Sequence, residues 1–257
     1  MKPRSIKQSA LVVLMAFSAC ARATPPSQPS SSPSVPRILL FTSTKGFHHS
    51  SIPAAVAALR RLGVQHGFEA TATSNPAVFS DAGLAGYRAV VFLLTSGDVL
   101  NGPQQAAFER FIARGRGYVG VHSASDTEYG WAWYGRLVGA FFANHPKIQR
   151  AAVNVVDQTF ASTTDLPARW VRTDEWYNFR TDPTPNVHVL LTLDERSYSG
   201  GAMGALHPIA WCHEFDGGRS WYTAMGHSSS AYSEPLFVAH LLRGILYATA
   251  MDPTPCG

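Results

Sequence analysis

Hydrophobic residues follow two alternating patterns along most of the chain. Four short continuous apolar runs, typical of buried parallel strands, lie at 37–42, 68–73, 87–94 and 117–122. Residues 51–66 and 103–114 instead place apolar side chains three or four positions apart, as amphipathic helices do. This strand–helix order predicts an α/β domain with a mostly parallel central sheet and helices on both of its faces.

The second half of the chain is less regular. Residues 151–156 and 187–193 have strand-like patterns, and residues 235–250 have the pattern of an amphipathic helix. Two further runs, 207–214 and 219–225, are predicted to form a hairpin around Asp216-Gly217-Gly218, because glycine accepts the positive φ of a tight turn. We expect one domain over residues 37–250, followed by a short tail at 251–257.

The first 36 residues differ in composition from the rest. Basic residues, an apolar segment at 10–19 and small residues at 19–23 follow one another in the order typical of a secretory signal. Either the signal ends at residue 23, or it ends at residue 19 with Cys20 lipidated. Residues 24–36 are rich in Pro and Ser and predict a flexible linker. We expect an exported protein that is periplasmic, secreted or anchored to a membrane through Cys20.

The net charge reflects this leader. The chain has 21 Lys+Arg and 17 Asp+Glu, a net charge of +4, and four of the basic residues lie in the acid-free stretch 1–23. The remainder is neutral, so we expect no nucleic-acid partner. No glycine-rich phosphate-binding pattern follows the first predicted strand, so we expect no nucleotide cofactor. The sequence leaves the oligomeric state open.

Two cysteines remain beyond the leader. An exported protein can join Cys212 and Cys256 in a disulfide. However, Cys212 lies inside a predicted strand and Cys256 is the penultimate residue. We therefore expect two separate thiols, with Cys212 buried, and keep the disulfide as the alternative.

Histidines follow three of the predicted strands. His48 and His49 come after the first strand, His122 after the fourth, and His227 after the strand at 219–225. Because the loops at the carboxyl ends of parallel strands converge, we expect these histidines to share a cleft. We favour His48 over His49 as the histidine that faces it. A divalent metal such as zinc, held by His48 and His227, is one interpretation, since ligands need to be close only in space.

Acidic and aromatic residues suggest a sugar ligand. The segment Asp174-Glu175-Trp176-Tyr177 combines carboxylates, which accept from hydroxyls, with rings that stack on sugars; a surface turn is the alternative. Trp133 fits the same interpretation, although spaced aromatics on a helix are more often core. His207 is expected at the edge of the site, and His213 is interpreted as a structural histidine.

Together these segments resemble the ThuA-like, or trehalose-utilisation, domain family. The matching residues are 46–49, 120–126, 131–134, 139–142, 145–146, 174–177, 207–211, 218–222 and 226–227. The resemblance implies a flavodoxin-like, class I glutamine amidotransferase-like three-layer sandwich. In the amidotransferases the turn after the central strand carries a nucleophilic cysteine. His122 stands there in this sequence, so glutaminase chemistry is not expected.

The family context implies carbohydrate metabolism, including oxidised disaccharides that bear a ketone. A base then removes the acidified C–H proton next to the ketone and expels the glycosidic oxygen, and water adds later. We assign His122 as the base, Asp126 or Glu175 as orienting groups, and Arg219 or a metal as the stabiliser of the enolate oxygen. The predicted substrate-binding residues are His49, Ser123, Trp133, Asp174, Tyr177 and His207.

Two alternatives remain open. Loss of the amidotransferase cysteine and the aromatic-rich cleft also suit a sugar-binding module without catalysis. A glycosidase would need Asp126 and Glu175 to face each other about 5–9.5 Å apart across the sugar.

Overall fold

The computed structural model describes Met1 and residues 35–257. The predicted signal, Cys20 and the predicted linker up to residue 34 lie outside the described residues. Residues 35–257 form one compact unit built on a nine-stranded sheet. The strand order across this sheet is β2-β1-β3-β4-β11-β10-β9-β6-β7.

The sheet has a parallel half and an antiparallel half. The parallel half comprises β1 (Arg37–Phe41), β2 (Glu69–Thr73), β3 (Ala89–Leu93), β4 (Gly117–Val121) and β11 (Gly218–Thr223). The antiparallel half continues from β11 with β10 (His207–Phe215), β9 (His188–Asp194), β6 (Gln149–Val155) and β7 (Arg169–Asp174). Parallel neighbours need a crossover, usually a helix, and the fully described stretch 139–234 contains no α-helix. The sheet is therefore mixed rather than mostly parallel.

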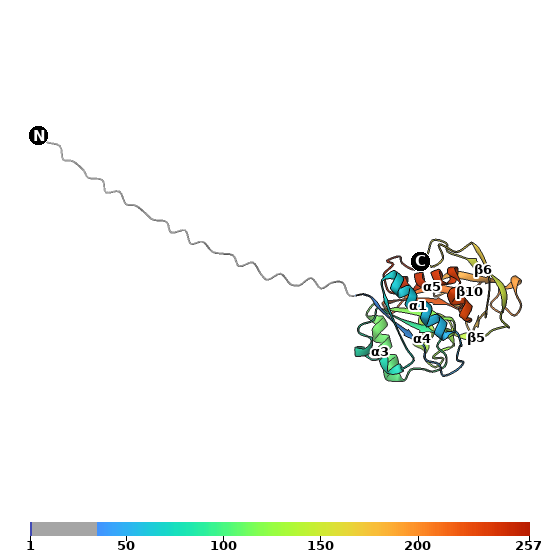
Figure 1. The fold of residues 1–257 in the computed structure, drawn as a ribbon, viewed down its shortest axis with the longest axis horizontal. Coiled ribbons are helices and arrows are strands. Elements are labelled where there is room, and N and C mark those ends of the chain that lie inside the picture. Colours follow the sequence, from blue (N-terminus) through green and yellow to red (C-terminus); the bar gives the residue numbers. More distant parts are fainter. Residues whose placement is uncertain (2–34) are drawn as a thin grey trace. The chain divides into compact units, whose positions relative to one another are not determined.

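Helices cover both faces of the sheet. The α-helices are α1 (Ile52–His66), α2 (Asp81–Leu84), α3 (Gly102–Ala113), α4 (Ala132–Val138) and α5 (Pro235–Ala248). Helix α5 lies against one face, where Gly117 of β4 packs on Ala248. On the other face, the hydroxyl of Tyr118, the next residue of β4, is 2.8 Å from that of Tyr134 in α4. Consecutive residues of one strand thus contact different helices, and Figure 1 shows the ribbons of α5 and α4 in separate places.

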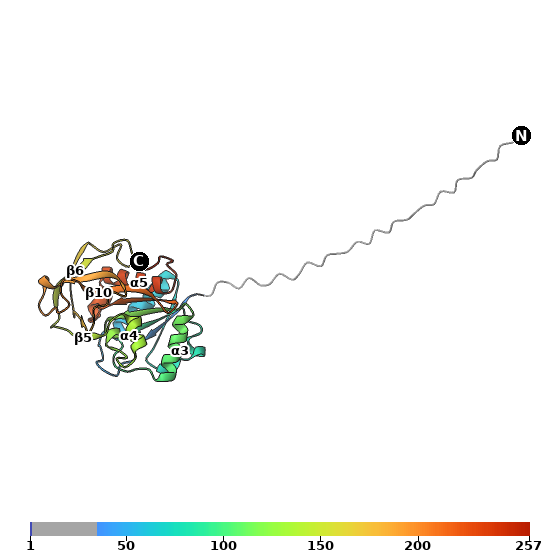
Figure 2. The same ribbon diagram turned by 180° about the vertical axis from the view of Figure 1, so that it is seen from behind.

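The predicted elements agree with the structure to within two residues at every boundary. The structure adds β7, the short α2 and α4, and a separate ribbon of β5 (Phe142–Asn144) with β8 (Asn178–Phe179). The view from behind in Figure 2 shows β5 beside α4, away from α3. This placement puts the β5–β8 ribbon close to the candidate site described below.

The cysteines are bonded, which corrects the expectation of two separate thiols. Cys212 of β10 and Cys256 form a disulfide, with Cα atoms 5.9 Å apart. The reason is the course of the chain after α5. It returns to the sheet so that Gly257 packs against His188, the cross-strand partner of Cys212. The position of Cys256 in the sequence gives no hint of this return.

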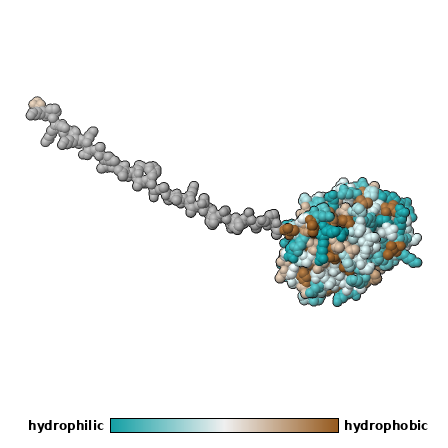
Figure 3. All heavy atoms as spheres, viewed as in Figure 1, coloured by the Kyte–Doolittle hydropathy of each residue, from teal (hydrophilic) through white to brown (hydrophobic). Residues whose placement is uncertain are grey.

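The domain surface is a mixture of hydrophilic and hydrophobic residues on the face shown in Figure 3. The large hydrophobic side chains exposed on the domain, such as Phe47, Val64 and Ile148, come from separate segments. Among the described residues, none of the helices has both the length and the apolar character needed to cross a bilayer.

Candidate functional site

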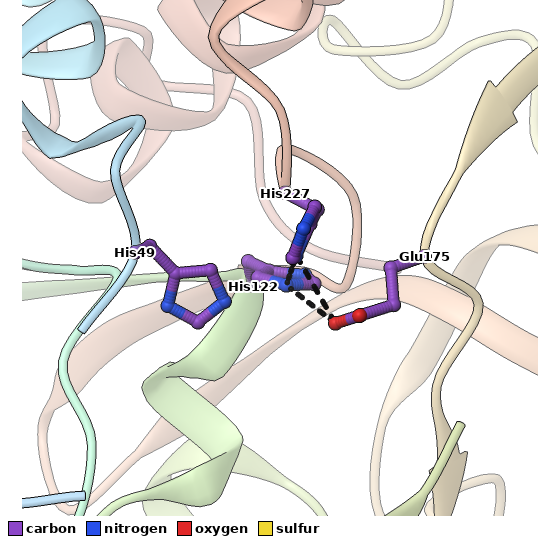
Figure 4. Close-up of side chains that lie close together, drawn as sticks. All are labelled: His49, His122, Glu175 and His227. Carbon is purple, nitrogen blue, oxygen red and sulfur yellow. Dashed lines mark hydrogen bonds and ion pairs between the residues drawn. The ribbon is translucent and has the colours of Figure 1, made fainter. Parts of the chain in front are cut away.

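Four side chains from distant parts of the sequence converge at one edge of the sheet. His49 precedes α1, His122 follows β4, Glu175 follows β7 and His227 lies shortly after β11. One ligand atom from each lies within 4.8 Å of those of the other three. Figure 4 shows the three imidazoles and the carboxylate directed toward one another from these separate elements. We call these four residues the histidine–glutamate cluster.

A sharp turn after β4 aims His122 into the cluster. His122 has a φ of 52°, in the left-handed region that non-glycine residues rarely adopt. Such a conformation costs on the order of 1–3 kcal/mol and persists only where neighbours enforce it. The hydroxyl of Tyr222 donates to the backbone carbonyl of His122 at 2.8 Å, and the imidazole itself is completely buried. The turn is therefore held from the adjacent strand.

Hydrogen bonding fixes which nitrogen of His122 carries the hydrogen. Its Nδ1 is 2.7 Å from the carbonyl oxygen of Ala224, which only accepts, so Nδ1 donates. In the neutral ring, Nε2 is then a bare acceptor. This Nε2 lies 3.3 Å from Oε2 of Glu175 and 3.2 Å from Nδ1 of His227. Two acceptors that face each other at this distance favour a shared cation or proton between them.

The charges of the cluster follow from burial and neighbours. Burial lowers the pKa of His49 to about 3, and the nearby His122 and His227 contribute to this lowering. Burial alone would raise the pKa of Glu175, but the adjacent imidazoles of His122 and His227 outweigh it and hold that pKa well below its usual range. The Glu175 hydrogen bond raises the pKa of His227. Glu175 therefore favours the protonated form of His227, and a metal ion bound there would compete with that proton.

Buried polar residues hold the His227 loop in place. The carboxylate of Asp174, 1% exposed, accepts the backbone N–H of Gly226 at 2.9 Å and of His227 at 3.1 Å. Arg172 in turn donates to Asp174 at 2.6 Å. The Ser51 hydroxyl, at the start of α1, donates to the carbonyl of His227 at 2.7 Å. Asp174 therefore positions a member of the cluster and does not face the cavity.

A cavity of about 240 Å³ opens beside the cluster. Aromatic rings and polar groups line it: Phe47, His49, Asp126, Phe142, His145, Glu175 and Tyr177. Asp126 accepts a hydrogen bond from the Tyr129 hydroxyl at 2.5 Å, and burial raises the pKa of its carboxyl group. His145 Nδ1 is 3.3 Å from Oε1 of Glu175, the oxygen that does not contact His122. Asp126 and His145 thus provide the cavity wall with two separate groups that can act as an acid or a base.

The structure gathers most of the predicted site residues. Those in the cluster, in the cavity wall or directly behind them are His49, His122, Ser123, Asp126, Asp174, Glu175, Tyr177 and His227. Ser123 lies behind the cluster, because it is fully buried and its Oγ is 3.4 Å from Nδ1 of His49. Topology therefore carries distant residues to a shared edge, as the sequence analysis expects.

His48 is not part of the cluster, and its neighbour His49 takes that place. The side chain of His48 is exposed, and its Nδ1 is 3.1 Å from Oγ1 of Thr44. His49 is 3% exposed. The side chains of these consecutive residues thus differ in exposure, and only His49 faces inward. The sequence does not tell which one.

Arg219 lies at the other end of the strands from the histidine–glutamate cluster. It is paired with Gly117, the first residue of β4, whereas His122 follows the last one. Its guanidinium donates to the carbonyl oxygens of Tyr247 at 3.1 Å and Asp252 at 2.8 Å. Arg219 therefore fastens the chain after α5 and does not reach an enolate at the cluster.

Trp133 and His207 are also outside the cavity. The indole N–H of Trp133 donates to Asp216 in the β10–β11 turn at 3.2 Å, away from the cluster. His207 is buried, with Nδ1 2.8 Å from Glu195 and Nε2 2.8 Å from the carbonyl oxygen of Tyr177. These bonds use both of its nitrogens. His207 supports the backbone of Tyr177 and has no nitrogen left for a ligand.

His145 is a site residue that the sequence analysis does not assign. It follows the short strand β5, and its ring stacks on Tyr177 with centroids 6.0 Å apart. The only sequence signal is its position beside Pro146, in a segment that resembles the family. Because a strand of three residues has no readable hydrophobic period, its place at the cavity is visible only in the structure.

The fold and the cluster define the class of this protein: a mixed α/β domain with three histidines and a glutamate at the carboxyl edge of its parallel strands. The family model described as trehalose utilisation, ThuA, matches residues 37–248. The chain therefore belongs to the ThuA family, as its motifs indicate.

Solved structures of similar proteins agree with this assignment. A putative ThuA-like protein from Bacteroides uniformis has a TM-score of 0.72 at 21% identity, covering 89% of this chain and 98% of that one. A putative ThuA-like protein from Parabacteroides merdae has a TM-score of 0.69 at 18% identity, covering 84% and 90%. A β-galactosidase from Bacillus circulans sp. alkalophilus has a TM-score of 0.53 at 13% identity, covering 85% of this chain but 31% of that one. These likenesses concern the fold. No curated protein matches the chain.

Proposed function

We propose that this ThuA-family protein is a metal-dependent enzyme that cleaves keto-glycosides, which are glycosides with a ketone on the sugar ring. The observation that carries the proposal is the histidine–glutamate cluster, whose ligand atoms lie within 4.8 Å of one another. Imidazole and carboxylate donors suit a divalent metal such as zinc. Nε2 of His122 lies 3.3 Å from Oε2 of Glu175, so an imidazole nitrogen and a carboxylate oxygen would both be directed at an ion bound there.

The carbohydrate class is supported by the family and by the cavity wall. The matching family is described by trehalose utilisation. Phe47, Phe142 and Tyr177 present aromatic rings to the cavity, and such rings suit the apolar faces of sugars. Asp126 and His145 add polar groups that accept from or donate to sugar hydroxyls.

The chain offers separate groups for the base and the acid. A divalent ion held by the histidine–glutamate cluster would supply electrostatic stabilisation of the negative charge on the ketone oxygen. Asp126, which lines the cavity and has a raised pKa, takes the proton from the carbon next to the ketone. The C–H electron pair forms a C=C bond, and the glycosidic C–O bond breaks. His145 gives a proton to the leaving oxygen, and water then adds across the C=C bond.

In this proposal the base is Asp126 and not His122. Its Nδ1 donates to Ala224, and its Nε2 is directed at Glu175 and His227, so it has no nitrogen free for the sugar. A two-carboxylate glycosidase mechanism is also less well supported. Oε2 of Glu175 is engaged by two histidines and Oε1 faces His145, which leaves no oxygen free to attack a sugar.

Two finer assignments accompany the proposal. The left-handed turn at His122 after β4 supports a class I glutamine amidotransferase-like, flavodoxin-like sandwich in which a histidine occupies the nucleophile's turn. The Cys212–Cys256 disulfide supports export, because disulfides persist in oxidising compartments. Lipidation of Cys20 would add a membrane anchor, and the mass of the mature N-terminal peptide tests that step.

The test combines metal analysis with turnover. The purified full chain is expected to hold one zinc equivalent and to convert a 3-keto-disaccharide, with both properties lost on chelation and restored by zinc. His122→Ala is expected to lose metal and activity together. His48→Ala is the matched control, because His48 is next to the cluster but outside it. Full turnover in the chelated protein would disprove the metal dependence. Tight sugar binding without product would instead identify a sugar-binding module.

A further inference from the structure

The cavity beside the histidine–glutamate cluster has a buried end and an exposed rim. Three of its lining residues, His49, Glu175 and Tyr177, are no more than 8% exposed. Two other lining residues, Phe47 and His145, are exposed to solvent. His49 and Glu175 belong to the cluster, so the buried end adjoins it. A ligand held at the cluster therefore meets solvent on the side of Phe47 and His145.

The cavity is too small to enclose a whole disaccharide. Its volume is about 240 Å³, whereas sites that enclose drug-sized ligands have roughly 300–1,000 Å³. A disaccharide is a ligand of that size, and a single sugar ring is smaller. In the reaction proposed above, the ring that bears the ketone lies next to the cluster and so fills the buried end. The group linked to that ring must then lie at the rim.

Phe47 offers a fixed aromatic surface at this rim. The residue is 63% exposed, and its ring meets the buried His49 ring edge-on, with centroids 4.8 Å apart. Its backbone carbonyl accepts a hydrogen bond from the hydroxyl of the fully buried Ser96 at 2.7 Å. The backbone N–H groups of Lys45 and Gly46 donate to the carbonyl of Ser96 at 2.7 and 3.3 Å. The loop after β3 therefore holds Phe47 in place, which lowers the entropic cost of binding a ligand on its exposed ring.

We propose that Phe47 binds the leaving group of the substrate: the keto ring of a disaccharide occupies the cavity, and the second sugar ring packs on the exposed face of Phe47. This inference rests on the function proposed above and narrows its substrate class. His145, the proton donor to the leaving oxygen, lies at the same rim, as that role requires. The substrates are therefore sugars with a terminal keto ring, and a leaving sugar is preferred to a small leaving group such as methyl.

The test measures binding by calorimetry, with trehalose, maltose and methyl α-glucoside added to the zinc-loaded full chain. These sugars have no ketone, so binding is measured without turnover. At least one disaccharide is expected to bind about threefold or more tightly than methyl α-glucoside, the size of effect that an aromatic contact gives. Phe47→Ala is expected to abolish this preference, and Phe47→Tyr, which keeps the ring, to retain it. Val64→Ala is the matched control, because it shortens an exposed apolar side chain on α1 that does not line the cavity.

Turnover gives a second readout: Phe47→Ala is expected to raise KM for a keto-disaccharide more than for the methyl keto-glucoside. Two outcomes would overturn the role of Phe47. One is a wild-type chain that binds no sugar, or binds the disaccharides no more tightly than methyl α-glucoside. The other is a Phe47→Ala variant that keeps the preference or weakens all three sugars equally. A preference that depends on Phe47, without turnover of any keto-sugar, would instead refute the reaction and retain this binding surface, so the two proposals can fail separately.

Discussion

At the scale of single residues, the cluster depends on Asp174, a carboxylate that does not belong to it. Asp174 accepts the N–H groups of Gly226 and His227 and receives Arg172. Its Oδ2 binds both Arg172 and the Gly226 N–H, while Oδ1 binds the His227 N–H. An asparagine at this position has only one acceptor oxygen. At least one of the three donors would therefore face the side-chain NH2 group, which is itself a donor, and would lose its hydrogen bond.

Asp174→Asn is therefore expected to lower zinc affinity about 10- to 100-fold, the usual effect of disturbing groups that orient metal ligands. Zinc affinity is measured by competition with a chelating dye. Asp165→Asn is the matched control, because Asp165 pairs with Arg243 on the surface and has no contact with the His227 loop. An unchanged affinity in Asp174→Asn would show that the His227 loop keeps its position without this carboxylate.

The residue scale is also where sequence reasoning stops first. His122 and His227 were predictable, because each follows a strand whose direction is readable from its neighbours. The choice between His48 and His49 was not, since it depends on the rotation of a loop about its own axis. Glu175 was recognisable as a candidate, but its contact with His122 depends on the antiparallel half of the sheet. No sequence spacing encodes a contact of this kind.

At the scale of elements, the strands of the parallel half were predictable and β7 was not. Strands β1, β3 and β4 are almost wholly apolar, because both of their faces are covered. Strand β7 alternates between buried and exposed positions, but two of its buried residues are Arg172 and Asp174. A hydrophobicity pattern reads these as exposed. Because Arg172 and Asp174 are polar although they are buried, β7 lacks the hydrophobic alternation by which a strand is recognised in a sequence.

The disulfide links β10 to the chain after α5 and so joins two elements far apart in sequence. Cys212 and Cys256 are separated by 44 residues. Closing a loop of that length in the unfolded chain contributes about 4 kcal/mol in the chain-entropy account, and measured values are typically 2–4 kcal/mol. We expect Cys256→Ser to lower the free energy of unfolding by about 2–4 kcal/mol.

Urea denaturation of the oxidised wild type and of Cys256→Ser measures this loss. The Cys212→Ser/Cys256→Ser double variant is expected to match the single variant, since either change removes the same bond. Reduction of the wild type with dithiothreitol is expected to give a similar loss, while the same reagent leaves Cys256→Ser unchanged. Equal stability of oxidised and reduced wild type would show that the crosslink contributes nothing to folding.

At the scale of the whole molecule, several histidines are buried in the neutral form in different parts of the fold. Burial lowers the pKa of His240, in α5, to about 4, and does the same for His213 in β10. The ordinary value is 6.5 for both. Between these values the unfolded chain binds protons that the folded chain does not. The free energy of unfolding therefore has its full value above pH 6.5 and falls as the pH is lowered toward 4.

Each such histidine contributes up to about 1.4 kcal/mol per pH unit, so these two give a slope of up to about 3 kcal/mol per unit between roughly pH 6 and 5. Urea midpoints at about pH 7, 6 and 5 are expected to fall accordingly. His240→Asn keeps a donor near the Ser162 carbonyl. It is expected to lower by about one the number of protons that the chain takes up on unfolding, and so to reduce the slope. His66→Asn, at an exposed helix end, is expected to leave it unchanged. A flat profile over this range would mean that the folded chain binds as many protons as the unfolded chain, and hence that burial does not lower the pKa of these imidazoles.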